Sequence, residues 1–293
     1  MLEKVRNATV AGQFYPGTES SLKQQIEESF LDARGVGKLP IIDQGKKNIK
    51  GLVVPHAGYI YSGAIASHAY YNLTQNGFAN TFVILGPNHT GAGSGVSVMT
   101  EGTWKTPLGE VPINKTLAGK IHSGIIDRDE TAHKYEHSIE VQLPFLQYIA
   151  HDKSFSFVPI CMMMQDYDTS SEVGTILADA IKSEKSTVIV ASSDFSHAGF
   201  NYMSMPPAGM RVDDYAEKQD KLAIDKILAL DPEGLIKTVH DKNISMCGYG
   251  PVSAMLVAAI KLGAKKAELL KYGNSYEVYP STSCVGYGAL TIY

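Results

Sequence analysis

Three stretches of the sequence decide the fold prediction: residues 51–59 (GLVVPHAGY), 81–91 (TFVILGPNHTG) and 187–197 (TVIVASSDFSH). Each stretch opens with a short apolar run and continues through a polar turn that contains one histidine. Runs that are apolar at every position are typical of strands covered on both faces of a sheet. We therefore expect three buried strands, each ending close to a histidine.

The rest of the chain alternates between similar runs and helical patterns. Two further apolar runs, residues 156–160 and 284–291, also predict strands. The patterns between the runs predict helices over residues 20–33, 62–76, 114–123, 168–183, 213–230, 231–240 and 249–262. Such alternation is typical of an α/β fold, a mostly parallel twisted sheet flanked by helices. We expect residues 1–293 to form a single domain.

Composition excludes several classes of protein. The chain of 293 residues is 44% hydrophobic and 19% charged, which excludes a disordered chain. A net charge of −4 offers no basic stripe for nucleic acid. The longest apolar run, residues 254–260, is too short to span a bilayer, and residues 1–9 lack the apolar core of a signal peptide. Three scattered cysteines do not form a disulfide framework, so we expect a cytoplasmic protein.

Metal-binding residue types gather where the predicted strands end. The carboxyl ends of parallel strands meet at one edge of a sheet, so His56, His89 and His197 are expected to lie together. Cys247 stands at the start of a predicted helix, whose N-terminus is expected to lower the pKa of its thiol. Imidazole and thiolate are ligands for zinc, copper and iron. We predict a metal centre or catalytic centre here, although each histidine alone could be a hydrogen-bonded loop residue.

Four neighbouring residues are candidates for supporting roles. Asp194 is predicted to orient a ligand histidine, with a loop or helix cap as the alternative. His137 is predicted to move protons and Glu140 to contact substrate, with structural hydrogen bonds as the alternative for both. Tyr59 is predicted to line the pocket.

Residues 133–137 also contain the pattern H-x-x-E-H. On a helix, His133 and His137 would bind zinc and Glu136 would act as the base of a zinc hydrolase. Pro144 disfavours this interpretation, because a helix that includes residues 133–137 would carry the proline in its interior. A helix that starts near residues 138–140 is the more economical prediction, and it leaves 133–137 in a loop.

The sequence resembles the Memo family in eight blocks that run in consistent order from residue 6 almost to the end. They are residues 6–16 (RNATVAGQFYP), 55–63 (PHAGYIYSG), 85–91 (LGPNHTG), 102–112 (GTWKTPLGEVP), 136–146 (EHSIEVQLPFL), 192–197 (SSDFSH), 247–253 (CGYGPVS) and 284–290 (CVGYGAL). The resemblance implies a fold related to the LigB-like class III extradiol dioxygenases. It also implies a metal site at His56, His89 and His197 with Cys247 nearby. Prokaryotic members resemble protein B of the AmmeMemoRadiSam system, which implies an AMMECR-type protein and a radical SAM enzyme as partners.

The ligand set departs from that of the dioxygenases, which hold Fe(II) with two histidines and a carboxylate. The matching positions here offer three histidines and a thiol, with Asp194 and Glu140 as the nearby carboxylates. We therefore expect redox chemistry with Fe(II) or copper, zinc being possible, rather than ring cleavage. Cys247 would be a fourth ligand or a redox thiol, and the pocket would take a small molecule or a peptide. The alternative is a non-catalytic adaptor with a vestigial pocket.

Overall fold

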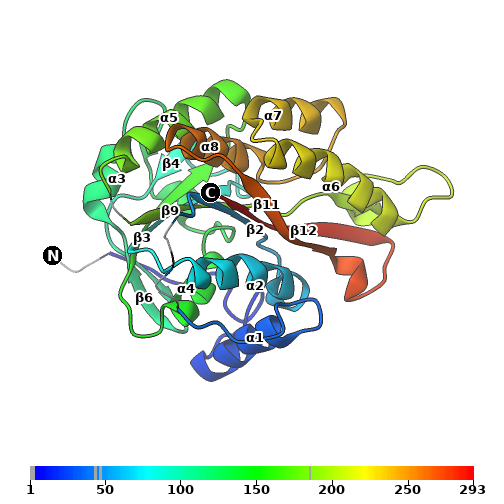
Figure 1. Ribbon diagram of the computed structural model, residues 1–293, viewed down its shortest axis with the longest axis horizontal. Coiled ribbons are helices and arrows are strands. Elements are labelled where there is room, and N and C mark those ends of the chain that lie inside the picture. Colours follow the sequence, from blue (N-terminus) through cyan, green and yellow to red (C-terminus); the bar gives the residue numbers. More distant parts are fainter. Residues whose placement is uncertain (1–3, 43–44, 46–47, 185) are drawn as a thin grey trace.

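A twisted sheet runs through the centre of the molecule, with helices above and below it (Figure 1). The computed structural model describes residues 4–42, 45, 48–184 and 186–293. Four adjacent parallel strands form the centre of the sheet: β2 (Gly51–Val54), β9 (Thr187–Ser192), β3 (Thr81–Pro87) and β8 (Ser156–Met162). Their residues are almost all buried, as the continuous apolar runs predict.

The flanks of the sheet differ from the mostly parallel arrangement that the sequence predicts. β12 (Ser283–Ile292) pairs antiparallel with β2, β10 (His197–Gly199) and β11 (Ala267–Asn274). On the other side, β4 (Val96–Val98) pairs antiparallel with β8 and parallel with β7 (Asp127–Arg128). β11 and β12 are antiparallel because a short connection joins them, whereas parallel neighbours need a long crossover. The centre of the sheet is therefore parallel as predicted, whereas most pairs at its flanks, apart from β4 with β7, are antiparallel.

Helices cover both faces of the sheet, which confirms the predicted α/β fold class. One layer contains α3 (Lys115–Ile121), α5 (Tyr167–Ile181), α7 (Pro232–Asp241) and α8 (Tyr249–Lys261). The other contains α1 (Glu19–Leu31), α2 (Tyr59–Gln75) and α4 (Gln142–Ala150). α6 (Val212–Leu228) packs on β10, β11 and β12. Figure 1 shows the two layers on either side of the strands.

Capping side chains mark the starts of α3, α5 and α7. Asn114 and Asp231 accept hydrogen bonds from backbone N–H groups in the first turns of α3 and α7. The start of α2 differs, because the helix begins at Tyr59 and not at Ser62. The hydroxyl of Ser62 donates to the carbonyl oxygen of Ala57, so it does not cap the helix. As a result, the helix starts almost immediately after His56.

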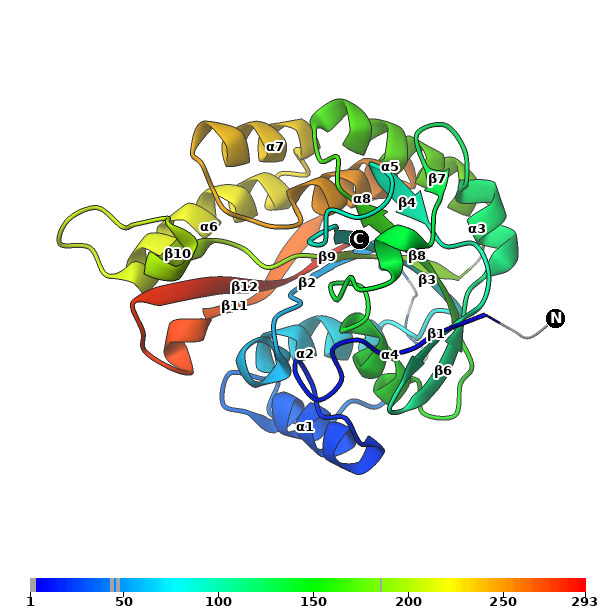
Figure 2. The same ribbon diagram turned by 180° about the vertical axis from the view of Figure 1, so that it is seen from behind.

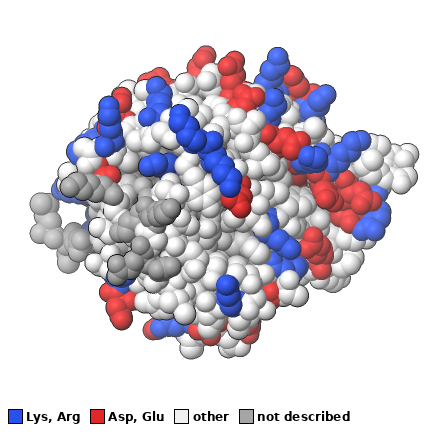
Figure 3. All heavy atoms as spheres, in the orientation of Figure 1, with Lys and Arg blue, Asp and Glu red and all other residues white. Residues whose placement is uncertain are grey.

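A second, smaller sheet was not predicted. It contains β1 (Val5–Arg6), β5 (Thr103–Thr106) and β6 (Gly109–Pro112). Short 3-10 helices lie elsewhere in the described chain: η1 (Thr131–His133), η2 (Phe200–Tyr202) and η3 (Ser275–Glu277). Figure 2 shows the N-terminal segment, in dark blue, running from β1 past α4 towards α1. On the face seen in Figure 3, acidic and basic side chains are interspersed. Within the described parts of the chain, no helix is both long and apolar enough to cross a membrane.

Candidate metal centre

The strand-end histidines all face one pocket. In the sheet, Val54 of β2 lies beside Ser192 of β9, so these two strands end at the same level. His56, His89 and His197 follow the ends of β2, β3 and β9 and line a pocket of about 460 Å³. The carboxyl edge of the central strands therefore brings together residues that lie far apart in the sequence.

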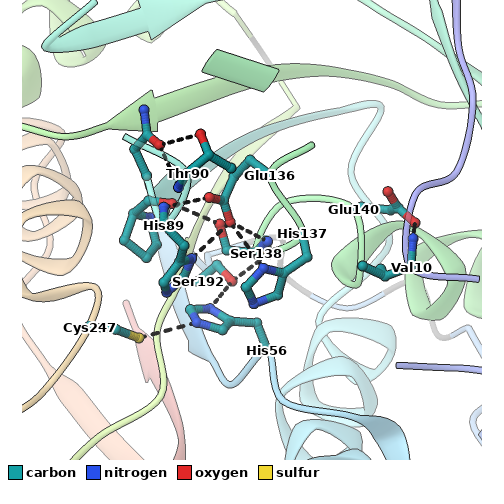
Figure 4. A network of polar contacts seen from close by, with 12 residues as sticks. Val10, His56, His89, Thr90, Glu136, His137, Ser138, Glu140, Ser192 and Cys247 are labelled. Atoms are coloured by element: carbon teal, nitrogen blue, oxygen red, sulfur yellow. Dashed lines mark hydrogen bonds and ion pairs between the residues drawn. The ribbon is translucent and has the colours of Figure 1, made fainter. Parts of the chain in front are cut away.

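Three of the four predicted ligands form a tight group. Donor atoms of His56, His89 and Cys247 all lie within 4.8 Å of one another. The Sγ atom of Cys247 is 3.1 Å from Nε2 of His56. A dashed line marks this contact in Figure 4. His197 faces the same pocket but lies outside this group, with its ring 5.0 Å from that of Tyr202. Of the four predicted ligands, His56, His89 and Cys247 therefore form one cluster, and His197 lines the same pocket outside that cluster.

Ser192 determines which nitrogen of the His56 ring carries the proton. The Ser192 hydroxyl has one hydrogen, and it donates this hydrogen to the carbonyl oxygen of Ser138 at 2.6 Å. Its Oγ atom must then accept from its other partners, Gln142 Nε2 at 2.8 Å and His56 Nδ1 at 2.9 Å. His56 therefore carries its proton on Nδ1 and has an unprotonated Nε2, the form in which imidazole binds metal ions.

The other two strand-end rings are anchored in the same way. His197 Nδ1 lies 3.0 Å from the carbonyl oxygens of Phe195 and Ser245, which can only accept. His89 Nδ1 lies 2.9 Å from a carboxylate oxygen of Glu136. In each ring Nδ1 is the donor, so Nε2, on the other side of the ring, is left unprotonated. Protein anchors on the second nitrogen are the usual arrangement for histidines that bind metal ions.

The thiol of Cys247 is not activated by the helix that follows it. Cys247 lies just before the N-cap of α8, Gly248, where a side chain would collide with the carbonyl oxygen of Ser192. This glycine lets the cysteine approach the end of β9. Burial, together with the charge of Asp194, raises the pKa of Cys247 above its ordinary value. The predicted lowering of the pKa is therefore wrong, because loss of solvation outweighs the helix N-terminus.

Asp194 has a different role from the predicted one. Its carboxylate accepts the backbone N–H groups of His56 at 2.8 Å and Ala57 at 3.3 Å, and no contact in the described chain joins it to an imidazole by a hydrogen bond. Its own N–H points at the Cys247 sulfur at 3.3 Å. Asp194 therefore orients the backbone of His56 and the sulfur of Cys247, two of the candidate ligands.

Two predicted substrate contacts lie away from the pocket. Glu140 is fully buried and forms an ion pair with Arg6. Tyr59 is 5% exposed and its hydroxyl donates to the carbonyl oxygen of Val141 at 2.6 Å. Neither residue lines the pocket, so both predictions are wrong. Tyr61, two residues further along the first turn of α2, lines the pocket instead.

The H-x-x-E-H pattern does not form a zinc-binding helix. Residues 134–137 lie in a loop after η1, and α4 begins only at Gln142, with Pro144 in its first turn. His133 is fully buried against Trp104, with ring centroids 5.9 Å apart, whereas His137 lines the pocket. The two histidines face different surroundings, so the zinc hydrolase alternative is excluded.

The position of His137 agrees with a role at the pocket. Its ring lies 4.6 Å from that of His89 and 5.4 Å from that of His56. Burial lowers the pKa of His137 to about 4, although the nearby Glu136 carboxylate raises it. Phe14, from the N-terminal segment, lies 4.6 Å from the same ring and forms part of the pocket wall.

Sequence reasoning missed the residues that anchor the rings. Glu136 was considered only within the zinc motif, and Ser192 and Ser245 were not singled out. For Ser192 a signal existed, since it follows the apolar run of β9 directly. No local signal marks Ser245, because its contact with His197 joins residues 48 positions apart.

The fold and the site together define a class: α/β proteins with a histidine and cysteine centre at the carboxyl edge of a parallel sheet. A model of the Memo family, described as Memo-like protein, matches residues 6–291. A MEMO1 family protein of Methanopyrus kandleri is 45% identical over 97% of this chain and 98% of its own length. Another, of Methanosarcina barkeri, is 46% identical over 98% of this chain and 100% of its own length. The chain belongs to the Memo family, which confirms the resemblance found in the sequence.

A solved structure supports the fold. An uncharacterized protein from Escherichia coli K12 superposes with a TM-score of 0.54, covering 83% of this chain and 99% of that chain. The two sequences are 15% identical, so the likeness concerns the fold alone. A central sheet flanked by helices is consistent with the predicted Memo and LigB-like fold.

Proposed function

We propose that this protein is a metal-dependent redox enzyme whose ion, Fe(II) or copper, is held by His56, His89 and Cys247. The observation that carries the proposal is the anchoring of both imidazoles at Nδ1, which leaves an unprotonated nitrogen on each ring beside the Cys247 thiol. When bound, such an ion supplies one-electron chemistry that amino-acid side chains lack.

The donor atoms suit a soft or borderline ion. Imidazole and thiolate ligands select copper, iron and zinc over magnesium or calcium. The Sγ atom of Cys247 lies 3.1 Å from the unprotonated Nε2 of His56, close enough for the thiol proton to lie between the two atoms. A metal ion binds the thiolate, so the thiol must lose this proton on binding. The arrangement therefore supports a site in which a metal ion replaces the thiol proton of Cys247.

Other pocket residues have proposed supporting roles. His197 is a fourth candidate ligand, because its Nδ1 is anchored like those of the other rings and it faces the same pocket. His137 is proposed to move protons, since its ring lies within 5.4 Å of the His56 ring. Asp194 keeps the backbone of His56 and the sulfur of Cys247 in place.

Ring cleavage of the extradiol type finds less support than other redox chemistry. That chemistry uses a carboxylate beside two histidines on the iron. Here Cys247 stands with His56 and His89. A carboxylate, Glu136, does group with His89 and His137, but its oxygens are engaged by the backbone N–H groups of His89 and Ser138 and by Nδ1 of His89. A thiolate beside two imidazoles suits copper or iron as well as zinc.

The pocket wall indicates the kind of ligand. Aromatic and hydroxyl side chains face the histidines, and none of the described residues that line the pocket is a lysine or arginine. The wall includes Tyr61, Tyr202, Tyr279, Ser275 and Ser281. A volume of about 460 Å³ suits a small molecule or a peptide side chain. The AMMECR-type protein and the radical SAM enzyme stay predicted partners.

Metal analysis tests the proposal. The protein is purified anaerobically without chelators, and its metal content and electron paramagnetic resonance spectrum are measured. We expect bound iron or copper in the wild-type protein, little in His89→Ala and Cys247→Ala, and wild-type content in the control His122→Ala, whose side chain is exposed at the end of α3. Wild-type protein without iron or copper above background would contradict the proposal.

Calorimetry in buffers of different ionisation enthalpy adds a second measurement. Binding should release about one proton per ion in the wild-type protein. A peptide ligand that binds the double variant His56→Ala, Cys247→Ala as tightly as the wild-type protein would instead support an adaptor.

A further inference from the structure

We propose that Glu136 is a positioning residue that fixes the tautomer of His89 and thereby sets the metal affinity of the centre. The part of this proposal that concerns metal affinity rests on the proposed function. The part that concerns the tautomer stands on the metal-free structure alone. Glu136 is 0% exposed, and its carboxylate reaches His89, as the dashed lines in Figure 4 mark.

Both oxygens of the Glu136 carboxylate are engaged around one ligand. Oε2 accepts the backbone N–H of His89 at 2.6 Å, and Oε1 accepts the backbone N–H of Ser138 at 2.8 Å. Oε1 also lies 2.9 Å from Nδ1 of His89. The carboxylate therefore holds the main chain and the ring of the same residue, which fixes both the position and the rotation of the imidazole.

The chemistry of these partners leaves one proton arrangement. Backbone N–H groups are always donors, and an ionised carboxylate only accepts. Nδ1 of His89 must therefore donate, and in the neutral ring, which has a single ring N–H, Nε2 is unprotonated. The anchors of the other two rings are the hydroxyl of Ser192 and the carbonyl oxygens of Phe195 and Ser245, which are neutral. A hydrogen bond to a charged acceptor is roughly twice as strong as one to a neutral acceptor, so His89 has the firmest anchor of the three.

The local fold holds the carboxylate against the ring. Gly86 lies near the end of β3, and a side chain there would collide with Ser138. The glycine thus lets the turn that contains Glu136 lie on the strand that leads to His89. The Ser138 hydroxyl donates to the carbonyl oxygen of Pro87 at 3.1 Å, which ties the turn to this strand end.

The same carboxylate also reaches the proposed proton carrier. Its Oε1 atom lies 3.5 Å from Nδ1 of His137, whose ring is stacked 4.6 Å from that of His89. One buried charge therefore faces both a proposed ligand and a proposed proton carrier. We assign the firm contact to His89, because 3.5 Å exceeds the usual length of such a hydrogen bond.

The substitution Glu136→Gln tests the proposal with little change of shape. Glutamine has one oxygen and one NH₂ group in place of two oxygens. If the NH₂ group takes the place of Oε2, it faces the backbone N–H of His89. If it takes the place of Oε1, it faces the backbone N–H of Ser138. We expect His89 to populate both tautomers in the metal-free variant, and the affinity for Zn²⁺ to fall about 10- to 100-fold.

Two measurements follow the effect. Two-bond ¹H–¹⁵N correlation spectra of the metal-free protein report which ring nitrogen of His89 is protonated. In a separate experiment, competition with a chromophoric chelator measures the affinity for Zn²⁺. The matched control is Glu140→Gln, since Glu140 is equally buried in the same turn but bonds to the N-terminal segment. This control should keep both the His89 tautomer and the Zn²⁺ affinity.

The outcomes separate the two proposals. Protonation of His89 at Nε2 in the wild-type protein would overturn the inference, and this measurement decides even where Glu136→Gln does not fold. An equal loss of Zn²⁺ affinity in Glu136→Gln and Glu140→Gln would also overturn it, because the effect would then come from the stability of the turn. Wild-type protein that binds no Zn²⁺, iron or copper would overturn the proposed function and the affinity claim, while the spectra still decide the tautomer.

Discussion

Glu136 and Glu140 lie four residues apart in one turn, and both are fully buried, yet they serve different regions of the molecule. Glu136 bonds to His89 at the pocket. Glu140 pairs with Arg6 and accepts the backbone N–H groups of Thr9 and Val10. For both carboxylates, burial raises the pKa but the donors and positive charges around them outweigh it, so the pKa falls, to about 2 for Glu136.

The comparison shows that burial and charge alone do not identify a functional residue. What differs is the partner: an imidazole in one case and the N-terminal segment in the other. Arg6 connects the two regions, since it pairs with Glu140 and also donates to the carbonyl oxygens of His133 at 3.1 Å and Glu136 at 2.8 Å. We therefore expect changes around Glu140 to affect stability, and changes around Glu136 to affect the site.

The largest expected effect is the loss of the ion pair. Glu140→Ala should lower the free energy of unfolding by about 3–5 kcal/mol, because Arg6 would remain buried without a counter-charge. Urea denaturation measures the change. The double variant Arg6→Ala, Glu140→Ala should lose less than the sum of the two single variants. Additive losses would show that the pair is not coupled and would remove the basis of the comparison.

A second prediction concerns His133, which lies in the turn held by Arg6. Burial lowers the pKa of His133 to about 4, and the positive charge of Arg6 lowers it further, whereas Asp129 and Glu136 raise it. Between pH 6.5 and 4 the unfolded chain binds the proton more readily, so stability falls as the pH falls. From pH 7 to pH 5, the contribution of His133 to this loss should be about 2 kcal/mol.

The variant His133→Phe isolates this contribution, because phenylalanine keeps the aromatic contact with Trp104 but cannot be protonated. Urea denaturation at pH 7 and pH 5 should show a smaller pH effect in the variant than in the wild-type protein. Equal pH effects in both proteins would mean that His133 finds a partner for its proton in the folded state.

A third prediction compares a neutral anchor with a charged one. Ser192→Ala removes the acceptor that fixes the tautomer of His56. We expect the Zn²⁺ affinity to fall about tenfold, equivalent to about 1.4 kcal/mol, at the lower end of the range for such anchors. Chelator competition measures it. A larger loss than in Glu136→Gln would reverse the proposed order of the two anchors.

The smallest effect is expected where the two regions meet. Phe14 belongs to the N-terminal segment held by Glu140, and its ring lies 4.6 Å from that of His137. Phe14→Leu should lower the stability by about 0.5–1.5 kcal/mol through loss of the aromatic contact. The Zn²⁺ affinity should not change. A clear fall in affinity would mean that the N-terminal segment shapes the ligand cluster and would weaken the separation drawn here.

The parts of the fold that local pattern determines were predictable. The four central strands have continuous apolar runs, and the histidines after β2, β3 and β9 follow them within a few residues. The helix starts at Asn114 and Asp231 also carry local capping signals. The flanking strands were missed because β4 and β7 are only three and two residues long, and because most of β11 is half-exposed without an apolar run.

The candidate ligands of the site could be predicted from the sequence. The contacts and the burial of the residues around them could not. Glu140 looked like a pocket residue, because no pattern near it reveals a partner 134 positions away at Arg6. The pKa of Cys247 was predicted in the wrong direction, because a helix start is visible in the sequence whereas burial of the thiol is not. Long-range partners and desolvation are properties of the folded chain, and both errors arise from them.

The position of β12 has a consequence for the synthesis of the protein. Residues 290–292 pair with β2, near residue 51, and residues 283–287 contribute to the pocket wall. During translation, one edge of β2 must stay unpaired until β12, more than 200 residues further along the chain, has been made. Because pairings between distant segments form slowly, the wall of the pocket is complete only after β12 has been made and has paired with β2.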